Sequence, residues 1–131
     1  MPTIFTKIIN GEIPCHKIAE SADYLAFLDL KPIHAGHTLV IPKKEVDYIF
    51  DMDDAALGGL VAFAKKVAHA VKKEISCKKI GVMVAGLEVP HAHIHLVPIH
   101  GVGDLNFAKA QPASQEDLAA VAEKIRRHWK G

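Results

Sequence analysis

The segment from residue 89 to 100, VPHAHIHLVPIH, has histidine at three alternate positions, 91, 93 and 95. His91, His93 and His95 are each followed by a small or apolar residue. Successive side chains of a β-strand point to opposite faces, so this alternation predicts a strand over residues 91–98 with three imidazoles on one face. Whatever fold the chain adopts, we expect a sheet with one face that supplies partners to the ring nitrogens of three histidines.

The rest of the chain alternates between extended and helical periods. Short apolar runs bounded by proline, glycine or polar turns predict strands, and apolar residues at intervals of three and four predict helices. The predicted strands cover residues 16–20, 24–30, 38–41, 80–84 and 91–98. The predicted helices cover residues 3–10, residues 54–75 and a C-terminal segment capped by Ser114. Strands on both sides of one long helix predict an α+β fold, with an antiparallel five-stranded sheet, a long central helix and a C-terminal helix.

Gly58 and Gly59 interrupt the first turns of the long predicted helix. Each costs about 1 kcal/mol relative to alanine in a helix interior. Either another backbone approaches the helix closely there, for example that of a partner subunit, or the helix is simply imperfect. The residues alone leave both explanations open.

Composition restricts the class of protein. The chain has 131 residues, of which 50% are hydrophobic, enough for a single domain over residues 1–131 with its own core. Its 16 lysines and arginines nearly balance 15 acidic residues, which argues against a protein that holds nucleic acid through many phosphates. Cys15 and Cys77 fit no metal or redox spacing, and the N-terminus lacks the pattern of a signal peptide. We therefore expect a cytoplasmic protein.

Three interpretations of the histidine row, by which we mean His91, His93 and His95, are chemically reasonable. The row is an exposed polar sheet face, a metal site, or a nucleophilic histidine flanked by two that bind and protonate an anion. Three imidazoles in register make the exposed face the weakest interpretation, because each ring nitrogen needs a partner. Spacing alone does not decide between the other two.

Two further residues are placed where they can join such a site. His37 follows Gly36 at the start of a predicted strand, where it either reaches the site or faces solvent. Asp29 ends the apolar row of Leu25 and Phe27 on one strand face. It either starts a turn or accepts hydrogen bonds from a sugar beside an apolar slot. The other histidines are expected at the surface: His16, His34, His69, His100 and His128.

Three segments of the chain resemble the histidine triad (HIT) superfamily of nucleotide hydrolases and transferases. HAHIHLV at residues 91–97 fits the family pattern of His-x-His-x-His and two apolar residues, and TIFTKIINGEIP and YLAFLDLKPIHAGHTLVIPKK precede it in the family order. The resemblance implies that His93 is the nucleophile, which forms a nucleotidyl-histidine intermediate at the α-phosphorus. It implies that His95 contacts the phosphate and the leaving group, that His91 orders the surroundings of the nucleophile, and that His37 supports the site.

The resemblance also implies where the nucleoside binds. Asp29 matches the ribose-binding acidic residue, and Gly86 matches the glycine before the phosphate site. Leu87 and Glu88 stand where relatives often have glutamine and a small polar residue, so phosphate contacts from this loop, and with them the preferred leaving group, stay open. The base pocket of the family corresponds to Ile4, Phe5, Ile8, Phe27 and Leu30.

Many relatives bind a structural zinc ion through two cysteines and two histidines. Thr3, Thr6 and Glu45 stand at three of those positions here, and only His91 remains. We therefore predict no structural zinc and no other cofactor.

Together, the residues and the resemblance predict a homodimeric, metal-independent hydrolase of purine nucleoside phosphoramidates or related nucleotidyl compounds, which releases a nucleoside monophosphate. A dinucleoside polyphosphate hydrolase differs only in the leaving group and is the alternative enzyme. Two non-enzymatic functions are also compatible with the residues: a nucleotide-binding module with little catalysis, and a metal-binding protein that uses the histidine row. We expect no nucleic-acid partner and no membrane partner.

Overall fold

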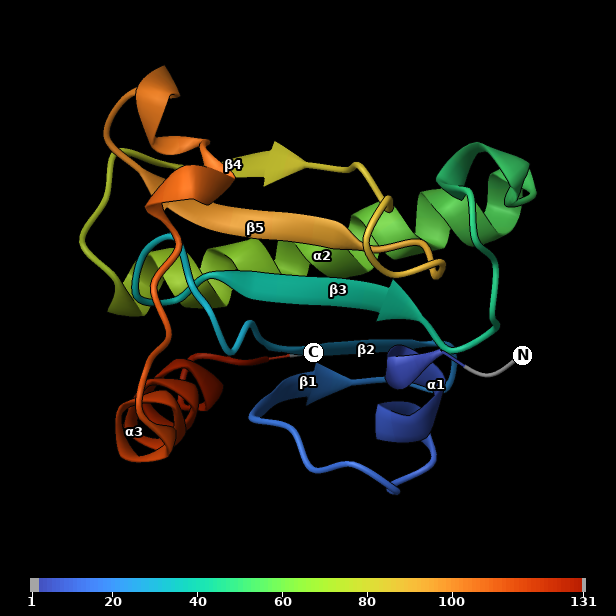
Figure 1. The fold of residues 1–131 in the computed structure, drawn as a ribbon, viewed down its shortest axis with the longest axis horizontal. Helices are drawn as coiled ribbons and strands as arrows, with labels where there is room; N and C mark the ends of the chain where they lie inside the picture. The colour runs from blue at the N-terminus through green and yellow to red at the C-terminus, as the bar shows by residue number, and fades with distance from the viewer. Residues whose placement is uncertain (1–2, 131) are drawn as a thin grey trace.

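Five antiparallel strands form the sheet of the computed structural model, which describes residues 3–130. The spatial order is β1-β2-β3-β5-β4, so β1 and β4 are the edge strands (Figure 1). The strands are β1 (Lys17–Glu20), β2 (Tyr24–Leu28), β3 (Thr38–Pro42), β4 (Lys79–Met83) and β5 (Ile94–Ile99). The helices are α1 (Ile4–Ile9), α2 (Asp54–Glu74) and α3 (Gln115–Arg126), with short 3₁₀ helices η1 (Ile49–Asp51), η2 (Val102–Asp104) and η3 (Phe107–Lys109). The predicted α+β fold is confirmed.

The predicted start of the histidine strand is wrong. β5 begins at Ile94, so His91 and His93 lie in the segment before the strand. The neighbouring strand β3 ends at Pro42, which has no N–H with which to extend the ladder. The Pro42 carbonyl accepts from the ring of His91 (2.8 Å), and the N–H of Ala92 bonds to the loop after β3.

The strand predicted over residues 24–30 also ends early, at Leu28. Asp29 still pairs with His37, the residue before β3, because the N–H of Asp29 donates to the carbonyl of His37 (3.0 Å). Asp29 therefore keeps a strand-like position, although Leu30 already belongs to the following loop.

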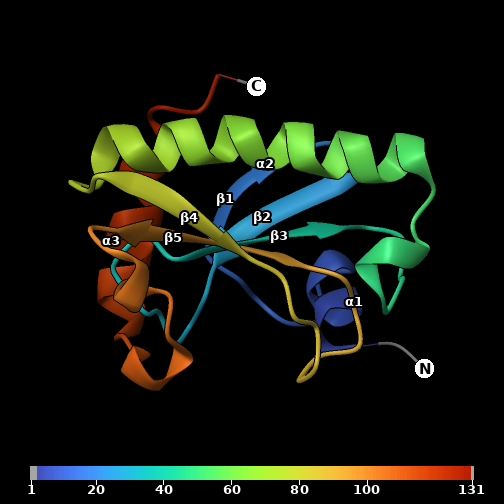
Figure 2. The same cartoon turned by 90° about the horizontal axis from the view of Figure 1, so that it is seen from above.

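The sheet separates two layers. α2 crosses one face, while α1 and the segment that contains η2 and η3 lie against the other (Figures 1 and 2). On the α2 side, apolar residues of α2, α3 and the strands form the main core, which includes Leu60, Val67, Val71, Leu96 and Ile125. On the opposite side, a smaller cluster contains Phe5, Leu25, Phe27, Leu39 and Ile41. His95 is paired with Leu39 across β5 and β3, so its side chain lies on this second face.

The two longer helices begin at acceptor residues that the sequence places there. Asp53 accepts a hydrogen bond from the N–H of Ala56 at the start of α2 (2.8 Å), and Ser114 accepts one from the N–H of Asp117 at the start of α3 (3.0 Å). Such caps satisfy backbone donors that the helix itself leaves unpaired. None of the helices within residues 3–130 combines the length and the apolar character needed to cross a membrane.

The close approach at the glycine pair of α2 comes from a side chain of the same molecule. The hydroxyl of Tyr24 donates to the carbonyl of Ala56 (2.8 Å). A Cβ at Gly59 would overlap that hydroxyl oxygen, whereas within residues 3–130 nothing lies within 4 Å of a Cβ at Gly58. Gly59 therefore makes room for Tyr24, and no approaching backbone of a partner subunit is needed to explain it.

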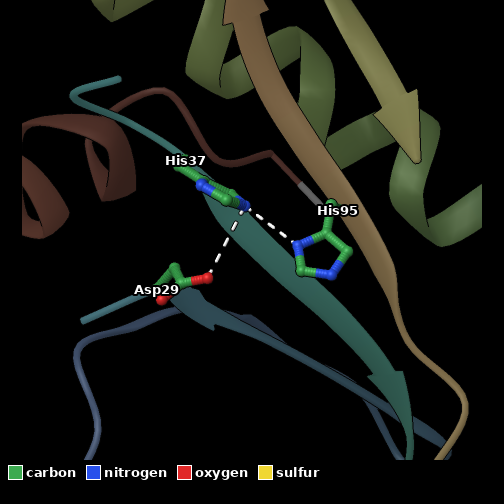
Figure 3. A group of neighbouring side chains, drawn as sticks. All are labelled: Asp29, His37 and His95. Atoms are coloured by element: carbon green, nitrogen blue, oxygen red, sulfur yellow. Dashed lines mark hydrogen bonds and ion pairs between the residues drawn. The ribbon is translucent and has the colours of Figure 1, made fainter. Parts of the chain in front are cut away.

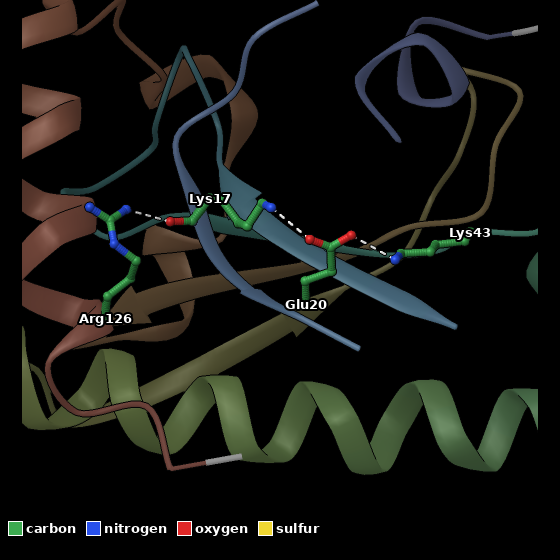
Figure 4. A network of polar contacts seen from close by, with 4 residues as sticks. All are labelled: Lys17, Glu20, Lys43 and Arg126. Carbon is green, nitrogen blue, oxygen red and sulfur yellow. Dashed lines mark hydrogen bonds and ion pairs between the residues drawn. The ribbon is translucent and has the colours of Figure 1, made fainter. Parts of the chain in front are cut away.

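Arg126 of α3 protects the edge strand β1 (Figure 4). It donates to the carbonyl of Lys17 (2.6 Å), a group that an edge strand otherwise leaves open to another chain. Glu20 on the same strand accepts from Lys17 and Lys43, both at 2.6 Å, and these bonds lower the pKa of the Glu20 carboxyl. Because these ion pairs are largely exposed, we expect them to add little to stability.

Candidate active site

A cavity of about 480 Å³ is lined by residues of α1 and η3. Figure 2 shows α1 on the face of the sheet opposite α2. The cavity lining is mostly apolar with a few polar groups, as is usual for sites that bind small molecules. The lining contains all the residues expected to contact a nucleoside and two members of the histidine row: Ile4, Phe5, Ile8, Phe27, Asp29, Leu30, Gly86, His93 and His95. His37 and His91 are 1% and 0% exposed and touch these lining residues from behind.

Two imidazoles and two phenyl rings form a row along the cavity. The ring centroids of Phe5 and His93 are 5.1 Å apart, those of His93 and His95 4.8 Å, and those of His95 and Phe107 5.0 Å, each pair edge to face. His93 and His95 are only 6% and 7% exposed. The interpretation of the histidine row as an exposed polar face is therefore wrong.

A chain of hydrogen bonds determines which nitrogen of His95 carries the proton. The backbone N–H of Ile33 donates to Nδ1 of His37 (3.0 Å), so the proton of neutral His37 is on Nε2. This Nε2–H donates to Nδ1 of His95, 3.0 Å away. The proton of neutral His95 is therefore on its own Nε2, on the far side of a ring that lines the cavity.

His93 has the opposite tautomer. Its Nδ1–H donates to the carbonyl oxygen of His91 (2.7 Å), an atom that can only accept. Nε2 of neutral His93 therefore has a lone pair and no proton. The adjacent rings of His93 and His95 offer one nucleophilic nitrogen and one N–H donor to the same cavity.

Burial keeps His37 and His95 uncharged. Desolvation lowers the pKa of each imidazole to about 4, and the neighbouring rings of His93 and His37 add to this effect at His95. The hydrogen-bond chain requires the neutral state, because a second proton on His95 would place two N–H groups against each other.

Asp29 lies beside this chain (Figure 3). Its Oδ2 is 3.6 Å from Nε2 of His37, and its Oδ1 accepts from the N–H of Lys31 (2.9 Å). Burial raises the pKa of the Asp29 carboxyl, although the Lys31 N–H and the nearby histidines act in the opposite direction. The side chain remains 24% exposed at the cavity, so an acceptor is available beside an apolar slot.

Asp29, His37 and His95 are also close enough to share a cation, since one ligand atom of each lies within 4.8 Å of the others. The proton positions do not fit a metal site, however. Ile33 holds Nδ1 of His37 as an acceptor, which leaves the proton on Nε2, the atom nearest both partners. A metal ion would have to displace that proton, because metal-bound nitrogen must be deprotonated. These three residues favour a proton network over metal binding.

His91 is held by hydrogen bonds at both ring nitrogens. Nε2–H donates to the carbonyl of Pro42 (2.8 Å), and Nδ1 accepts from the hydroxyl of Thr3 (3.1 Å). Burial lowers the pKa of this ring. Because its carbonyl holds Nδ1–H of His93, His91 orients that residue, and a metal site built from the three histidines of the row does not fit.

Thr3, Thr6 and Glu45 meet beside His91, at the positions where relatives have zinc ligands. Glu45 accepts from the hydroxyl of Thr6 (2.5 Å) and from the N–H of Thr3 (3.1 Å), and these bonds lower the pKa of its carboxyl. Two hydroxyls, a carboxylate and a fully hydrogen-bonded imidazole do not fit structural zinc, which proteins bind mainly through thiolate and imidazole. Hydrogen bonds from Thr3 and Thr6 to Glu45 connect α1 to the segment after β3 without a metal ion.

The loop before the histidine row turns at Gly86, which lines the cavity with a φ of 73°. This left-handed conformation favours glycine. Leu87, the next residue, also lines the cavity and is 91% exposed. The side chain that stands where relatives often have glutamine is therefore largely in contact with solvent.

Sequence reasoning missed part of the lining. The C-terminal segment supplies Phe107 and Ala110, for which the only signal is one aromatic residue in a polar loop. Other unexpected lining residues are Ile13, Pro14, Cys15, Leu28, Lys31, Leu39, Ala85, Leu87, Glu88 and Val89. The remaining histidines lie outside the lining and are exposed or half-buried: His16, His34, His69, His100 and His128.

Known proteins share this architecture. The family model of the HIT domain matches residues 10–102. An uncharacterised HIT-like protein of Methanocaldococcus jannaschii is 38% identical over 94% of this chain and 98% of its own length. The adenosine 5′-monophosphoramidase of Schizosaccharomyces pombe is 36% identical over 95% of this chain and 96% of its own. The crystal structure of a HIT-like protein from Bartonella henselae has a TM-score of 0.85 at 35% identity and covers 96% of this chain and 95% of that one. The resemblance inferred from three sequence segments is confirmed, and the chain belongs to the HIT family.

Proposed function

We propose that the protein hydrolyses purine nucleoside phosphoramidates, or related nucleotidyl compounds, through a covalent intermediate on His93 and without a metal ion. The observation that carries the proposal is the pair of opposite tautomers, with a lone pair on Nε2 of His93 beside Nε2–H of His95. The name of the Schizosaccharomyces pombe relative, an adenosine 5′-monophosphoramidase, supports this substrate class.

In the first step, Nε2 of His93 attacks the α-phosphorus of the bound substrate. A bond forms between phosphorus and His93, the bond between phosphorus and the amine nitrogen breaks, and the departing nitrogen takes the proton of Nε2–H of His95. His93 becomes positively charged, and His95, which is neutral before the step, becomes a negatively charged imidazolate. The Nε2–H of His37 stabilises that anion at Nδ1, and the adjacent His93 cation offsets its charge until the proton returns in the second step. The carbonyl of His91 stabilises the charged His93 ring through its hydrogen bond with Nδ1–H.

In the second step, water attacks the phosphorus of the intermediate. Its oxygen joins phosphorus, one of its protons returns to Nε2 of His95, and the electron pair of the bond to His93 returns to Nε2 of that ring. Nucleoside monophosphate leaves, and both histidines recover their starting tautomers. His37 takes no proton in this cycle; it holds Nδ1 of His95 as an acceptor throughout.

The nucleoside fits the apolar side of the cavity. The side chains of Phe5, Ile8 and Phe27 offer apolar surface to a base, and the Asp29 carboxylate, which also lines the cavity, offers an acceptor to ribose hydroxyls. Gly86 brings the backbone to the cavity without a side chain, where a phosphate group can approach.

The test is a His93→Ala variant assayed on an adenosine phosphoramidate. We expect turnover to be abolished while the Kd for adenosine monophosphate stays nearly unchanged, because the variant loses the nucleophile and keeps the nucleoside slot. His100→Ala, an exposed residue outside the lining, is the matched control. Undiminished turnover by His93→Ala would overturn the proposal.

Initial rates on an adenosine phosphoramidate and a diadenosine polyphosphate distinguish the two possible hydrolase activities. Higher kcat/KM on the phosphoramidate is the expected result. Tight binding of the monophosphate by the wild-type protein without turnover of either compound would favour a nucleotide-binding module.

We propose also that two copies associate through the free edge of β4. Val82 and Val84 at this edge are 59% and 42% exposed, and Val61 of the neighbouring helix α2 is 53% exposed. Antiparallel pairing of β4 with its copy would satisfy the unpaired edge and cover these side chains. Light scattering on the protein as it elutes from a size-exclusion column is expected to give twice the chain mass. Val82→Lys is expected to give monomers. A monomeric wild-type protein would contradict the proposed dimer.

A further inference from the structure

The cavity has an aromatic wall that the proposed chemistry leaves without a role. Phe107 of η3 packs edge to face on His95 and lines the cavity, yet its side chain is 48% exposed. It belongs to neither of the two core clusters within residues 3–130. When a ligand covers a half-exposed phenyl ring on a cavity wall, the burial of apolar surface lowers the free energy of the complex.

Backbone contacts hold this wall in place. The N–H of Gln111 donates to the carbonyl of Pro32 (3.1 Å), and the N–H of Ala113 donates to the carbonyl of Leu30 (3.2 Å). Asn106 caps η3 by accepting from the N–H of Ala108 (2.9 Å). The segment is therefore tied to the loop after β2, and Phe107 is positioned before any ligand arrives.

The order of the rings places Phe107 on the leaving-group side. Phe5 packs against the nucleophile His93 at the α1 end, where the nucleoside slot lies. Phe107 packs against His95, whose Nε2–H must reach the departing nitrogen. A substituent on that nitrogen is therefore carried toward Phe107 rather than toward Phe5.

The chemistry of the wall favours an uncharged, planar substituent. Lys31 is the single lysine or arginine in the cavity lining within residues 3–130, and Lys109 next to the wall is paired with Asp104 (3.4 Å). A leaving group with several phosphates would meet little positive charge here. An aromatic ring can stack on Phe107 or pack against its edge.

We propose that Phe107 is a specificity-determining residue, which binds the aromatic ring of an amine leaving group. The inference rests on the proposed function and names the class of amine that the reaction releases. It predicts that adenosine phosphoramidates of amines that carry an aromatic ring are better substrates than the unsubstituted compound, and that Phe107 is the cause.

The test compares kcat/KM for adenosine 5′-phosphoramidates of ammonia, n-butylamine and 2-phenylethylamine. We expect the wild-type protein to prefer the phenylethyl compound, and Phe107→Ala to lower its kcat/KM relative to the ammonia compound by about tenfold. Phe107→Tyr, which keeps a ring, is expected to retain the preference. Val102→Ala, in the same segment and 86% exposed, is the matched control.

Three outcomes overturn the inference. An equal loss on all three substrates means that Phe107 acts only through His95. A weaker Kd for adenosine monophosphate in Phe107→Ala means that the ring contacts the nucleoside. Unchanged kcat/KM values for all three substrates in Phe107→Ala mean that the ring contacts neither the amine nor His95 in a way that affects the reaction. Absence of turnover of all three compounds by the wild-type protein contradicts the proposed function itself, which separates the two failures.

Discussion

Nε2 of His37 lies 3.0 Å from Nδ1 of His95 in the interior of the protein, and this contact decides the chemistry that His95 can perform. His37 is itself held by the backbone of Ile33, so its tautomer is determined by the main chain. The proton on Nε2 of His95 is thus a consequence of the backbone hydrogen bond from Ile33 to His37, which acts on His95 through His37. His37 is a positioning residue, because it does not line the cavity.

His37→Ala is expected to lower kcat by about 10²-fold, because a misoriented acid loses most of the gain that positioned proton transfer supplies. The KM and the Kd for adenosine monophosphate should change little, since the nucleoside slot is intact. Steady-state kinetics and calorimetry check both quantities. His34→Ala, in the same loop, is the control and should keep wild-type kcat; a rise in KM alone for His37→Ala would contradict a positioning role.

Stability is expected to fall as the pH drops from about 6.5 to about 4. His37 and His95 have a pKa near 4 in the folded protein and an ordinary value of 6.5, so the unfolded chain binds more protons in this window. Each group then lowers the free energy of unfolding by up to about 1.4 kcal/mol per pH unit. Urea denaturation at several pH values measures the slope.

The slope is expected to become shallower in His37→Gln, which removes one of the two imidazoles whose pKa burial lowers to about 4. His34→Gln, which replaces a half-exposed histidine of the same loop, is the matched control. An identical slope in the wild-type protein and His37→Gln would show that His37 does not titrate in this window.

Local patterns predicted most of the fold. The short apolar runs of β2 and β3 and the long apolar stripe of α2 depend on neighbours only a few residues away, and the strands and the helix that they predict are confirmed. The predicted start of β5 at His91 is wrong, because the start of this strand depends on a residue far away in the sequence, Pro42, which ends the partner strand.

Long-range contacts also explain what was missed in the site. Phe107 reaches His95 only because backbone bonds tie the C-terminal segment to the loop after β2. The link between Thr3 and His91 joins the first helix to the histidine row across most of the chain. Residue spacing carries no information about such contacts. It identified His37 and Asp29 as candidates but left their alternatives open, and the resemblance to a family favoured a place in the site for both.

Thr3→Val is expected to destabilise the protein by about 1–3 kcal/mol, because it leaves Nδ1 of buried His91 without its donor. The loss also includes the cap of α1, where the Thr3 hydroxyl accepts from the N–H of Thr6 (3.1 Å). Urea denaturation measures the change. Thr3→Ser keeps the hydroxyl and should retain most of the stability. Equal losses in both variants would contradict this prediction, because the hydroxyl that serine retains would then give no advantage over valine.

The two adjacent glycines of α2 are expected to respond in opposite directions to alanine. Gly58→Ala should stabilise the protein by about 1 kcal/mol, since alanine is the better helix former and its Cβ meets open space. Gly59→Ala should destabilise it by about 1–3 kcal/mol, because its Cβ would collide with the Tyr24 hydroxyl and force that ring to move. The midpoint of thermal unfolding, measured for both variants, checks the signs.

Measuring Gly58→Ala and Gly59→Ala in a Tyr24→Phe variant tests whether the tyrosine hydroxyl causes the difference between them. Removing the hydroxyl also removes its bond to Ala56, and the nearest remaining ring carbon lies 3.0 Å from a Cβ at Gly59, farther away than the oxygen that overlaps it. The cost of Gly59→Ala should therefore shrink in this background, while the gain from Gly58→Ala should persist because the two sites share no partner. If Gly59→Ala costs the same with tyrosine or phenylalanine at position 24, the hydroxyl is not what requires glycine there.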